Sequence, residues 1–389
     1  MAAAWDMGRR QLRPIACSPF SRGFNYAWRM PPSGPMQRAI EAARSARGRT
    51  SPNPWVGAAV VRDGHILSVG ATSPPGGPHA EAAALSNVDA RGATLYTTLE
   101  PCMPFEGKRT RPCTQAILDA GVAKVVVGIE DPHSPVAGQG VALLRAQGIG
   151  VEVGDGAEEI AELLRPYLYY RQTGRPYVIA KFAVSLDGKA GAPAAGVRWL
   201  TSPPALARAQ QDRAWVDAIA VGSGTVLADD PALTARQDGQ LAEHQPLRII
   251  LDGRGRIPAA ARVLGPGAIV ASASRDPNWT SAIAATGATV LAIEETDGGL
   301  NLEQLLGALG QRSVMSLIVE GGPALLASVF AQQFVAEVHA YVAPLVLGPD
   351  ALPLFSGSVA FAPERLHDVR IEVLSPDVLI RGYTGPWTS

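Results

Sequence analysis

Four residues of this sequence have the types and the spacing of a zinc-dependent deamination site. His79 and Glu81 lie two positions apart in Pro-His-Ala-Glu, and Cys102 and Cys113 each follow a proline. One imidazole and two thiolates hold Zn²⁺ in such sites, and a glutamate that is not a ligand moves protons. Two ordinary buried thiols are the alternative, and a purely structural zinc site has four protein ligands, of which we find no fourth. The pattern therefore favours a catalytic zinc, with water in its fourth position and Glu81 as proton shuttle.

The prolines predict which elements carry these residues. Pro78 fits the start of a helix that begins with His79, and Pro112 fits the start of a second helix, Cys113 to Ala120. A helix dipole stabilises a thiolate at the N-terminus, as a metal ligand requires. We therefore expect His79 and Cys113 at two helix N-termini and Cys102 at the end of a strand.

Length and composition limit the class of protein. The chain has 389 residues, of which 47% are hydrophobic and 18% charged, which suits two domains with full cores. A formal net charge of −1 argues against a nucleic-acid binder that works by bulk electrostatics, so we expect a small-molecule substrate. Three cysteines, two of them assigned to a metal, indicate a reducing compartment and predict a cytoplasmic protein. No apolar run reaches the roughly 18 residues of a transmembrane helix, so no membrane association is expected.

Residues 1–35 differ from the rest of the chain. They carry five arginines against one acidic residue, Asp6, with scattered Pro, Gly and Ser. Such a leader is either a transit peptide, which would make the protein organellar, or an extension upstream of a start at Met30 or Met36. We expect a disordered extension without function.

Residues 36–155 alternate between helical and strand patterns. The expected helices are 37–47, a helix from 79, 113–120 and 139–147, and the expected strands are one within 51–61, 66–69, 93–98, 124–129 and 151–153. Asp63-Gly64 predicts a hairpin turn. This alternation predicts a three-layer α/β domain whose helices cover the sheet.

A helix rich in Glu, Leu and Tyr at about 155–170 ends before Gly174-Arg175-Pro176, so we place a linker helix and boundary at 156–175. A second α/β series occupies 176–389. Its expected strands are 177–184, 218–221, 248–251, 268–271, 289–293 and 317–320, and its helices lie near 203–214, 301–311 and 322–333. An antiparallel pair, 338–347 and 370–382, closes the sheet.

Three loops of the second series lie at strand ends, where open α/β sheets bind ligands. They are residues 185–189, 222–231 and 320–325. In the third, Gly321 and Gly322 allow a close backbone approach, and Pro323 opens a helix whose N–H groups can bind phosphate. GxGxxG is absent, so this is no standard Rossmann fingerprint. Each loop alone is typical of an ordinary strand–helix turn, and the three together predict a nucleotide site.

These motifs, in this order, resemble the bifunctional deaminase/reductase family of riboflavin biosynthesis over residues 36–385. The first half has Ser-Pro-Asn-Pro-x-Val-Gly-Ala at 51–58, His-Ala-Glu at 79–81 and Leu-Glu-Pro-Cys at 99–102. The second has Ser-Leu-Asp-Gly-Lys at 185–189, Trp-Leu-Thr-Ser at 199–202, Gly-Thr-Val-Leu-Ala-Asp-Asp-Pro-Ala-Leu-Thr at 224–234 and Val-Glu-Gly-Gly at 319–322. The resemblance implies a cytidine-deaminase-like domain, then a dihydrofolate-reductase-like α/β domain, with zinc, NADPH and a phosphoribosyl pyrimidine substrate. We also expect a homo-oligomer.

The resemblance further implies site residues. Asn53 would contact the deaminase substrate. The reductase substrate site would be lined by Lys181, Arg213, Leu233, Arg236 and Glu320. The cofactor would meet Ala183, Trp199, Thr225, Asp229, Gly322, Pro323, Ala324, Leu325, Leu326, Ala327 and Ser328. The two arginines suit a sugar phosphate, because guanidinium binds such anions in bidentate geometry.

The loop at 252–256 bears on whether the cofactor is NADPH or NADH. Asp252-Gly253-Arg254-Gly255-Arg256 follows the strand 248–251 and offers both charges in one loop. An acidic side chain favours NADH, whereas arginine favours the 2′-phosphate of NADPH. We expect an NADPH preference to which Arg254 or Arg256 contributes.

Three departures from the family pattern concern substrate recognition. Ten residues separate Cys102 from Cys113 where the family has eight, and either Lys108 or Arg109 would keep a basic contact. Thr72 stands where the family commonly has His, and Val197 where it has a substrate-binding Ser. An active reductase beside a deaminase of altered specificity is therefore the alternative.

Two more distant alternatives are a deaminase that edits nucleic acid and a nucleotide-binding regulatory protein with a relic zinc site. The near-neutral charge argues against the first. The intact Glu81 argues against the second, because a relic site has no use for a proton shuttle.

Overall fold

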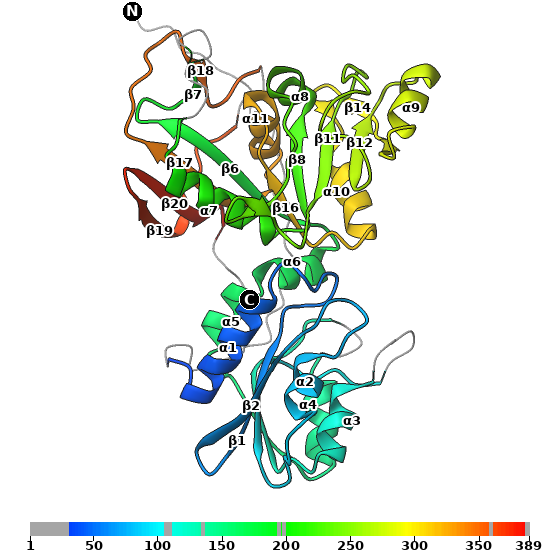
Figure 1. Cartoon of the computed structure of the whole chain (residues 1–389), viewed down its shortest axis with the longest axis vertical. Helices are drawn as coiled ribbons and strands as arrows, with labels where there is room; N and C mark the ends of the chain where they lie inside the picture. Colours follow the sequence, from blue (N-terminus) through cyan, green and yellow to red (C-terminus); the bar gives the residue numbers. More distant parts are fainter. Residues whose placement is uncertain are drawn as a thin grey trace, which may run out of the picture.

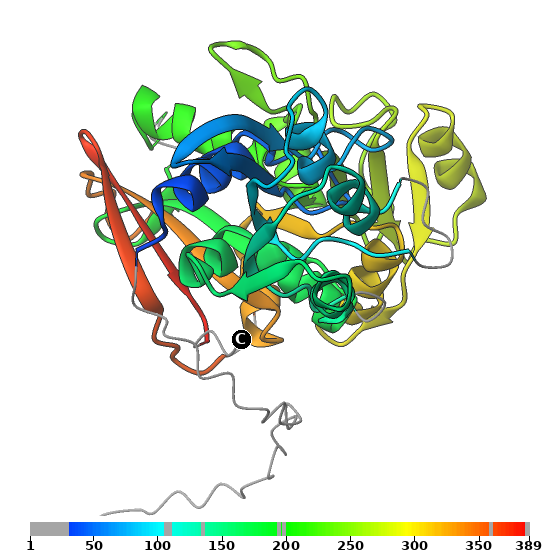
Figure 2. The same cartoon turned by 90° about the horizontal axis from the view of Figure 1, so that it is seen from below.

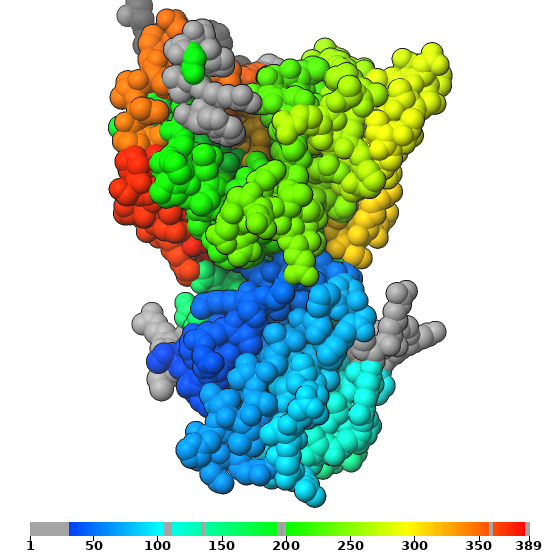
Figure 3. Space-filling model, viewed as in Figure 1, coloured from blue at the N-terminus to red at the C-terminus, as the bar shows by residue number. Residues whose placement is uncertain are grey.

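The computed structural model describes residues 31–104, 111–133, 137–192, 196, 200–357 and 361–385. Within these ranges the chain forms two α/β units, each around its own sheet, stacked along the long axis of the molecule (Figure 1, Figure 3). None of the helices in the described ranges combines the length and the apolar character needed to cross a bilayer.

The first unit surrounds a five-stranded sheet. Its elements are α1 (Gly34–Ala46), β1 (Gly57–Arg62), β2 (His65–Ala71), α2 (Ala80–Leu85), β3 (Thr94–Leu99), α3 (Cys113–Asp119), β4 (Lys124–Ile129), α4 (Gln139–Ala146) and β5 (Gly150–Val153). The strand order is β2-β1-β3-β4-β5, antiparallel across β2-β1-β3 and parallel from β3 to β5. The carboxyl end of β3 therefore opens at an edge shared with β4 and β5.

Two glycines allow helices to press against opposite faces of this sheet. A Cβ on Gly57 would lie 1.8 Å from Ala39 O in α1, and one on Gly70 would lie 2.4 Å from Ala84 N in α2. Gly57 pairs with Ala71, the neighbour of Gly70, so the two glycines face opposite sides. The expected three-layer arrangement is thus confirmed, with α1 on one face and α2 on the other (Figure 1).

The start of α1 corrects the predicted boundary at residue 35. Ser33 caps the helix, because its hydroxyl accepts the Met36 N–H while its own N–H and hydroxyl donate to the Asp155 carboxylate. The helix begins at Gly34, which was assigned to the disordered extension. Residues 1–30, for which the disorder was mainly predicted, lie outside the described residues.

Two short helices connect the units. α5 (Ala157–Leu163) and α6 (Arg165–Thr173) replace the single helix expected at 155–170, because Leu164 departs from helical geometry with φ −90° and ψ 7°. Trp55 Nε1 donates to Leu163 O, and Tyr170 OH donates to Gly310 O. The helices therefore contact both units, and α6 lies between the two lobes (Figure 1).

The second unit surrounds a nine-stranded sheet. Its elements are β6 (Tyr177–Ser185), β7 (Lys189–Gly191), α7 (Pro203–Ala214), β8 (Ala218–Gly222), α8 (Ser223–Asp229), β9 (Arg236–Gln237), β10 (Gln240–Leu241), β11 (Leu247–Leu251), β12 (Ala268–Ser272), α9 (Pro277–Ala284), β13 (Thr289–Ala292), β14 (Glu295–Thr296), β15 (Gly299–Leu300), α10 (Leu302–Gln311), β16 (Ser316–Val319), α11 (Pro323–Ala331), β17 (Val335–Ala343), β18 (Leu352–Pro353), β19 (His367–Leu374) and β20 (Asp377–Tyr383). The order is β13-β12-β11-β8-β16-β6-β17-β20-β19, parallel up to β17 and antiparallel beyond it. Figure 2 shows the β19–β20 hairpin, in red, at the outer edge of the molecule.

Two predictions for this unit were wrong in detail. The expected antiparallel pair, 338–347 and 370–382, is three strands, because β17 ends at Ala343 and the second segment folds back as β19 and β20. Pro376 lies in the intervening turn, where its missing N–H costs no ladder bond. The loop expected after Gly222 is the helix α8, in which Gly222 is the N-cap and Val226 faces the core.

The two units contact each other directly at the end of α1. The Arg47 guanidinium lies 4.8 Å from the Trp215 ring centroid, a cation–π distance. Ser51 Oγ donates a short hydrogen bond to the Asp217 carboxylate, which also accepts the Met315 N–H. Through these contacts the first unit meets the last turn of α7 and the start of β8.

Candidate active sites

The three predicted metal ligands converge. Cys102 Sγ lies 3.2 Å from Cys113 Sγ and 3.5 Å from His79 Nδ1, and the latter lies 3.4 Å from Cys113 Sγ. In the described part of the chain this is the one group of His, Cys, Asp or Glu side chains with metal-binding geometry. Zn²⁺ bonds thiolate sulfur at about 2.3 Å and imidazole nitrogen at about 2.0 Å, so donors at these separations surround a single ion. Two soft sulfurs and one imidazole fit zinc.

The elements that position the ligands match the prediction with a small shift. His79 is the N-cap of α2, and Cys113 is the first residue of α3 after the N-cap Pro112. Cys102 follows β3, and its sulfur accepts the Cys113 N–H at 3.4 Å. Both helix N-termini therefore point at the metal site, where they stabilise the thiolates.

Glu100 fixes the loop that carries Cys102. Its carboxylate, 3% exposed, accepts the N–H groups of Asp131 at 3.1 Å, Gly138 at 2.9 Å and Val141 at 3.0 Å. These bonds join the end of β3 to the start of α4. Sequence reasoning gave Glu100 no role, although it lies inside the Leu-Glu-Pro-Cys motif.

The protonation of Glu81 suits proton transfer. Its side chain is 3% exposed in the first turn of α2. Burial raises the pKa of Glu81 to about 7, and the neighbouring Cys102 thiolate adds to the rise. A hydrogen bond from the Cys113 thiol lowers the pKa of Cys102 to about 3. A carboxyl group whose pKa is near neutrality can both accept and donate a proton.

Two other residues of the first half have backbone partners. Thr72 Oγ1 accepts the Val56 N–H at 3.1 Å, so this residue joins the end of β2 to the chain before β1. Asn53, expected at the deaminase substrate, is half-buried in the turn before β1. Its N–H donates to Thr50 O at 2.8 Å and its carbonyl accepts from Thr50 Oγ1, which fixes the backbone of Asn53.

Three of the predicted reductase substrate residues form one cluster of charges. Arg213 binds Glu320 in bidentate geometry, with Nε to Oε1 at 2.8 Å and Nη2 to Oε2 at 2.7 Å. Lys181 Nζ lies 3.6 Å from Oε2 of the same carboxylate. Although burial opposes ionisation, Arg213 and Lys181 lower the pKa of Glu320 to about 2. Two positive charges against one negative charge leave the cluster positive, which suits a phosphorylated substrate.

Leu233 and Arg236 do not join this cluster. The Leu233 side chain is 4% exposed and packs in the hydrophobic core, although its backbone has the left-handed φ of 49°. The next carbonyl, of Thr234, accepts from Arg213 Nη1 at 3.1 Å. Arg236 is exposed on β9, where Nη1 donates to Gly239 O at 2.9 Å.

The predicted phosphate-binding segment begins at the N-terminus of α11. Gly322 is its N-cap and Pro323 its first residue. A Cβ on Gly322 would lie 3.3 Å from Thr225 Oγ1, so α8 and α11 meet at this point. Leu326 and Ala327 are each 2% exposed and face the core. Only the first turn of α11 therefore offers groups to a ligand.

The other predicted cofactor contacts lie in different places. Ala183 is half-buried on β6 and packs beside Tyr341, and Asp229 is exposed at the end of α8. The Ser328 hydroxyl donates to Ala324 O within α11. Trp199 lies outside the described residues, as do Lys108, Arg109 and Val197.

The loop after β11 turns its acid inward and its arginines outward. Asp252 is fully buried, and its carboxylate accepts the N–H groups of Arg256 at 2.6 Å and Ile257 at 2.8 Å. Arg254 and Arg256 are exposed, and Arg256 Nη2 donates to Ser223 Oγ at 2.7 Å. Asp252 therefore shapes the loop, and the arginines provide its external charge.

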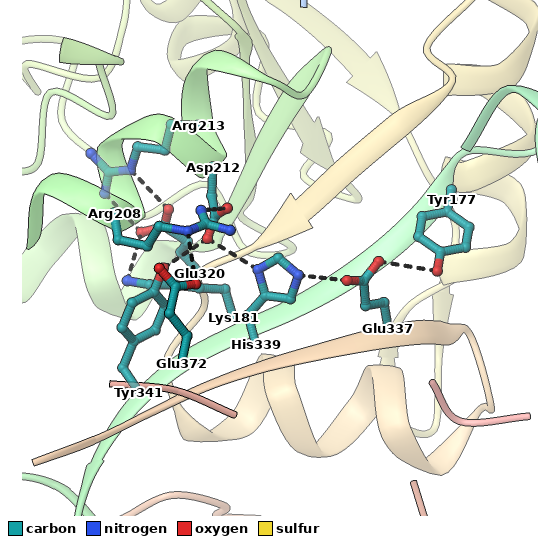
Figure 4. A network of polar contacts seen from close by, with 10 residues as sticks. All are labelled: Tyr177, Lys181, Arg208, Asp212, Arg213, Glu320, Glu337, His339, Tyr341 and Glu372. Atoms are coloured by element: carbon teal, nitrogen blue, oxygen red, sulfur yellow. Dashed lines mark hydrogen bonds and ion pairs between the residues drawn. The ribbon is translucent and has the colours of Figure 1, made fainter. Parts of the chain in front are cut away.

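Sequence reasoning missed a set of titratable residues behind the reductase cluster. Figure 4 shows them beside Lys181, Arg213 and Glu320, and hydrogen bonds and ion pairs join them to one another. They are Tyr177, Arg208, Asp212, Glu337, His339, Tyr341 and Glu372. One pattern in the sequence indicates this set. Positions 337, 339 and 341 place titratable side chains on one face of a strand that is otherwise apolar.

Comparison with known proteins identifies both units. A family model of the RibD C-terminal domain matches residues 176–380, and a model of the cytidine and deoxycytidylate deaminase zinc-binding region matches residues 33–129. The riboflavin biosynthesis protein RibD of Escherichia coli (strain K12) is 38% identical over 332 residues, which cover 81% of this chain and 88% of that protein. RibD of Mycobacterium tuberculosis (strain CDC 1551 / Oshkosh) is 39% identical over 353 residues, covering 89% and 95%.

Solved structures give the same result. Acinetobacter baumannii RibD superposes with a TM-score of 0.81 at 35% identity, covering 90% of this chain and 98% of that chain. The diaminohydroxyphosphoribosylaminopyrimidine deaminase/5-amino-6-(5-phosphoribosylamino)uracil reductase of Thermotoga maritima superposes with a TM-score of 0.77 at 31% identity and the same coverage. The predicted order of a cytidine-deaminase-like unit followed by a dihydrofolate-reductase-like unit is confirmed.

Proposed function

This chain belongs to the RibD family, the bifunctional deaminase and reductase enzymes of riboflavin biosynthesis, and we propose that it catalyses both reactions with zinc and NADPH. The first unit removes an amino group as ammonia from a diaminopyrimidinone that carries a phosphoribosylamino group. The second unit reduces the ribosyl group of the product to ribityl. The observation that carries the proposal is the presence in one chain of a zinc donor set beside the buried Glu81 and of a half-buried, positive Lys181–Arg213–Glu320 cluster.

In the first unit, His79, Cys102 and Cys113 hold one zinc per chain, which supplies Lewis-acid activation of water when bound. Glu81 accepts the proton of the attacking water and passes it to the ring nitrogen and to the departing ammonia. Its side chain is buried in the first turn of α2, and this burial raises the pKa of the carboxyl group. Asn53, on the turn before β1, contacts the pyrimidine or the ribose of the substrate.

In the second unit, Lys181 and Glu320 face the sugar of the substrate. Both Nε and Nη2 of Arg213 are engaged by Glu320, so Arg213 acts mainly by orienting that carboxylate. The exposed Arg236 is the cation available to the phosphate. The first turn of α11, with Thr225 of α8 beside it, would hold the pyrophosphate of NADPH, which would supply hydride for the sugar.

The test uses the full chain and follows the two products separately. We incubate it with the phosphoribosylated diaminopyrimidinone, with and without NADPH, and measure ammonia release and NADPH oxidation. Ammonia is expected in both conditions, and NADPH oxidation is expected to follow it. The Glu81→Gln variant should release no ammonia from the first substrate, yet should oxidise NADPH when given the already deaminated compound.

Two outcomes go against this proposal in different ways. Oxidation of NADPH with the deaminated compound, but no ammonia from the first substrate, favours an active reductase beside a deaminase of altered specificity. Neither product from either compound contradicts the assignment of both units.

We also propose a homo-oligomer and a cytoplasmic location. β19 is an edge strand on which Val369, Ile371 and Val373 are 49%, 68% and 74% exposed, a surface that a second copy of this chain can cover. Light scattering tests the oligomeric state, and a monomer at micromolar concentration contradicts the proposal.

The proposed cytoplasmic location rests on the thiolate zinc ligands, which need a reducing compartment. We propose 33–155, 156–175 and 176–389 as the deaminase, linker and reductase segments, with the first start moved to Ser33, which caps α1.

A further inference from the structure

Asp212, on the last turn of α7, joins that helix to β17. Its side chain is 3% exposed, and one carboxylate oxygen accepts the Tyr341 hydroxyl at 2.7 Å and lies 3.0 Å from His339 Nδ1. Arg208, one turn earlier, forms an ion pair with the other oxygen. Figure 4 shows the three partners around this carboxylate. The end of α7 is therefore fixed against β17 by charged hydrogen bonds, which are the strong kind.

His339 lies between two carboxylates. Its side chain is 6% exposed, with Nδ1 at Asp212 and Nε2 2.8 Å from Glu337 Oε1. Tyr177 OH donates to the other Glu337 oxygen at 3.1 Å. An ionised carboxylate only accepts, so both ring nitrogens must donate and the ring is an imidazolium. Although burial opposes this charge, Asp212 and Glu337 raise the pKa of His339 to about 9.

One consequence concerns Lys181. β17 and β6 are parallel neighbours in which His339 pairs with Lys181, so both residues project from the same face of the sheet. Lys181 Nζ lies 5.4 Å from the centroid of the Tyr341 ring. That ring is 1% exposed and is held by its hydroxyl on Asp212. The Tyr341 ring thus forms a fixed support beneath the Lys181 ammonium group.

The other consequence concerns Glu320. Arg213 follows Asp212 in the same helical turn and holds both Glu320 oxygens. A shift of this turn would move Arg213, and the Glu320 carboxylate with it. Asp212 therefore influences the positions of two residues of the reductase cluster: that of Lys181 through Tyr341, and that of Glu320 through Arg213.

We propose that Asp212 and His339 are positioning residues for the reductase reaction: they fix the last turn of α7 and the Tyr341 ring, and so hold Lys181, Arg213 and Glu320 in the arrangement that receives the substrate. The inference rests on the reductase activity proposed above. General stability is a poor reason for this arrangement, because buried ion pairs of this kind contribute little net stability compared with apolar residues of similar volume. The network around Asp212 and His339 lies directly behind Lys181, Arg213 and Glu320, so positioning these three residues is a better explanation for it.

The test is Tyr341→Phe in the full chain, because it removes one hydroxyl and keeps the ring beneath Lys181. We expect kcat/KM for reduction of the phosphoribosyl substrate to fall roughly tenfold, as coupling between contacting side chains implies. The loss should come mainly through KM for that substrate, with KM for NADPH changed by less than about twofold. Ammonia release by the same chain should stay at the wild-type rate and reports that the first unit is folded.

The matched control is Tyr167→Phe on α6, whose side chain packs in the core of the first unit. Tyr167 is also buried, at 2% exposed, and its hydroxyl lies 3.0 Å from both oxygens of the buried Asp131. The Tyr167→Phe substitution also removes a hydrogen bond from a tyrosine hydroxyl to a buried aspartate, but away from the reductase cluster. The kinetics of reduction should therefore not change. Wild-type KM and kcat for Tyr341→Phe, or an equal loss in both variants, overturns the proposal. A wild-type chain that reduces nothing contradicts the proposed function instead, before any variant is compared.

A spectroscopic measurement separates positioning from general stability. ¹⁵N NMR of the wild type at about pH 7.5 should show one imidazolium with both nitrogens protonated, assigned by its loss in His339→Gln. Asp212→Asn should convert that ring to a neutral tautomer and lower reduction by roughly 10- to 100-fold. A neutral His339 in the wild type contradicts the proposal. If Asp212→Asn fails to fold, Tyr341→Phe and the wild-type spectrum still decide it.

Discussion

The two candidate sites of this chain are built in opposite ways. The zinc donors come from a short stretch, with His79 and Cys113 34 positions apart, and each is placed by the backbone of a helix N-terminus or strand end. The reductase cluster combines residues that are distant in sequence: Arg213 and Glu320 are 107 positions apart, and Asp212 and Tyr341 are 129 apart. Long charged side chains there hold one another in place.

This difference predicts different responses to mutation. A ligand fixed by the backbone can be removed with little effect on its neighbours, so damage to the zinc site should stay local. A charged group held by other charged groups depends on all of them, so damage should spread through the reductase cluster. The bifunctional chain allows both cases to be measured on one molecule, with each activity as the control for the other.

The largest expected effect is that of Cys102→Ala. Loss of one of three protein ligands should reduce bound zinc from about one ion per chain to a trace, and ammonia release should fall below detection. NADPH oxidation with the deaminated substrate should stay within about twofold of the wild type. Metal analysis of the purified variant checks the first point, and undiminished zinc would remove Cys102 from the ligand set.

Glu81→Gln should have the next largest effect. The amide keeps the size of the side chain but cannot carry the proton, so ammonia release should drop by roughly 10²- to 10⁴-fold. Zinc content should remain at the wild-type level, because Glu81 is not one of the three converging donors. Deamination at the wild-type rate would show that another group moves the proton.

The same contrast explains what the sequence could reveal. Pro-His-Ala-Glu and the two Pro-Cys pairs lie within one stretch, so the whole ligand set and its helices were predictable from local patterns. Asp212 and His339 were not: titratable side chains at 337, 339 and 341 share one face of a strand, but no local pattern identifies a partner 127 positions away. Most strands of both sheets were predicted, since short buried apolar runs identify them.

The errors have physical reasons of their own. Gly222-Ser223-Gly224 is typical of a loop by propensity, yet α8 forms there because Val226 is buried against the sheet. Tertiary packing, which a local pattern does not contain, decided that outcome. The placement of Leu233 at the substrate site stays a prediction, and its side chain is 4% exposed.

The pH dependence of stability should distinguish the two regions further. The pKa of His339 is about 9 in the folded chain, above its value of about 6.5 when unfolded. The imidazolium therefore stabilises the fold fully below about pH 6.5, and this contribution is lost as the pH rises through about 9. The pKa of Glu320 is lowered to about 2, so its contribution is present above about pH 4.3 and lost at more acid pH.

Hydrogen exchange measures this effect region by region. Between about pH 6.5 and 9.5, the free energy of opening of β17 should fall by about 3 kcal/mol after correction for the intrinsic exchange rate. β4, in the first unit, is the control within the chain and should change much less. In His339→Gln the alkaline loss in β17 should disappear. Equal losses in both strands would show that His339 is not the group responsible.

The smallest expected effect concerns the choice between NADPH and NADH. This choice depends on exposed arginines, whose interactions are weaker than those of the buried charged groups discussed above. Asp252 is fully buried and accepts two backbone N–H groups, so it does not repel a ribose 2′-phosphate. Arg254 and Arg256 are exposed in the same loop, and Arg256 contacts Ser223 at the start of α8. We therefore expect NADPH to be preferred, with the two arginines contributing about 1–3 kcal/mol through charge-assisted hydrogen bonds.

The measurement is the ratio of kcat/KM for NADPH to that for NADH in the double variant Arg254→Ala, Arg256→Ala, which should fall by roughly 10- to 100-fold. Arg312→Ala is the control, because Arg312 is also exposed but lies before β16, at the opposite edge of the parallel sheet from the loop after β11. Its ratio should equal that of the wild type. An unchanged ratio in the double variant would mean that the 2′-phosphate is bound elsewhere. A wild-type preference for NADH would overturn the cofactor assignment itself, because the inward turn of Asp252 leaves only cations at this position.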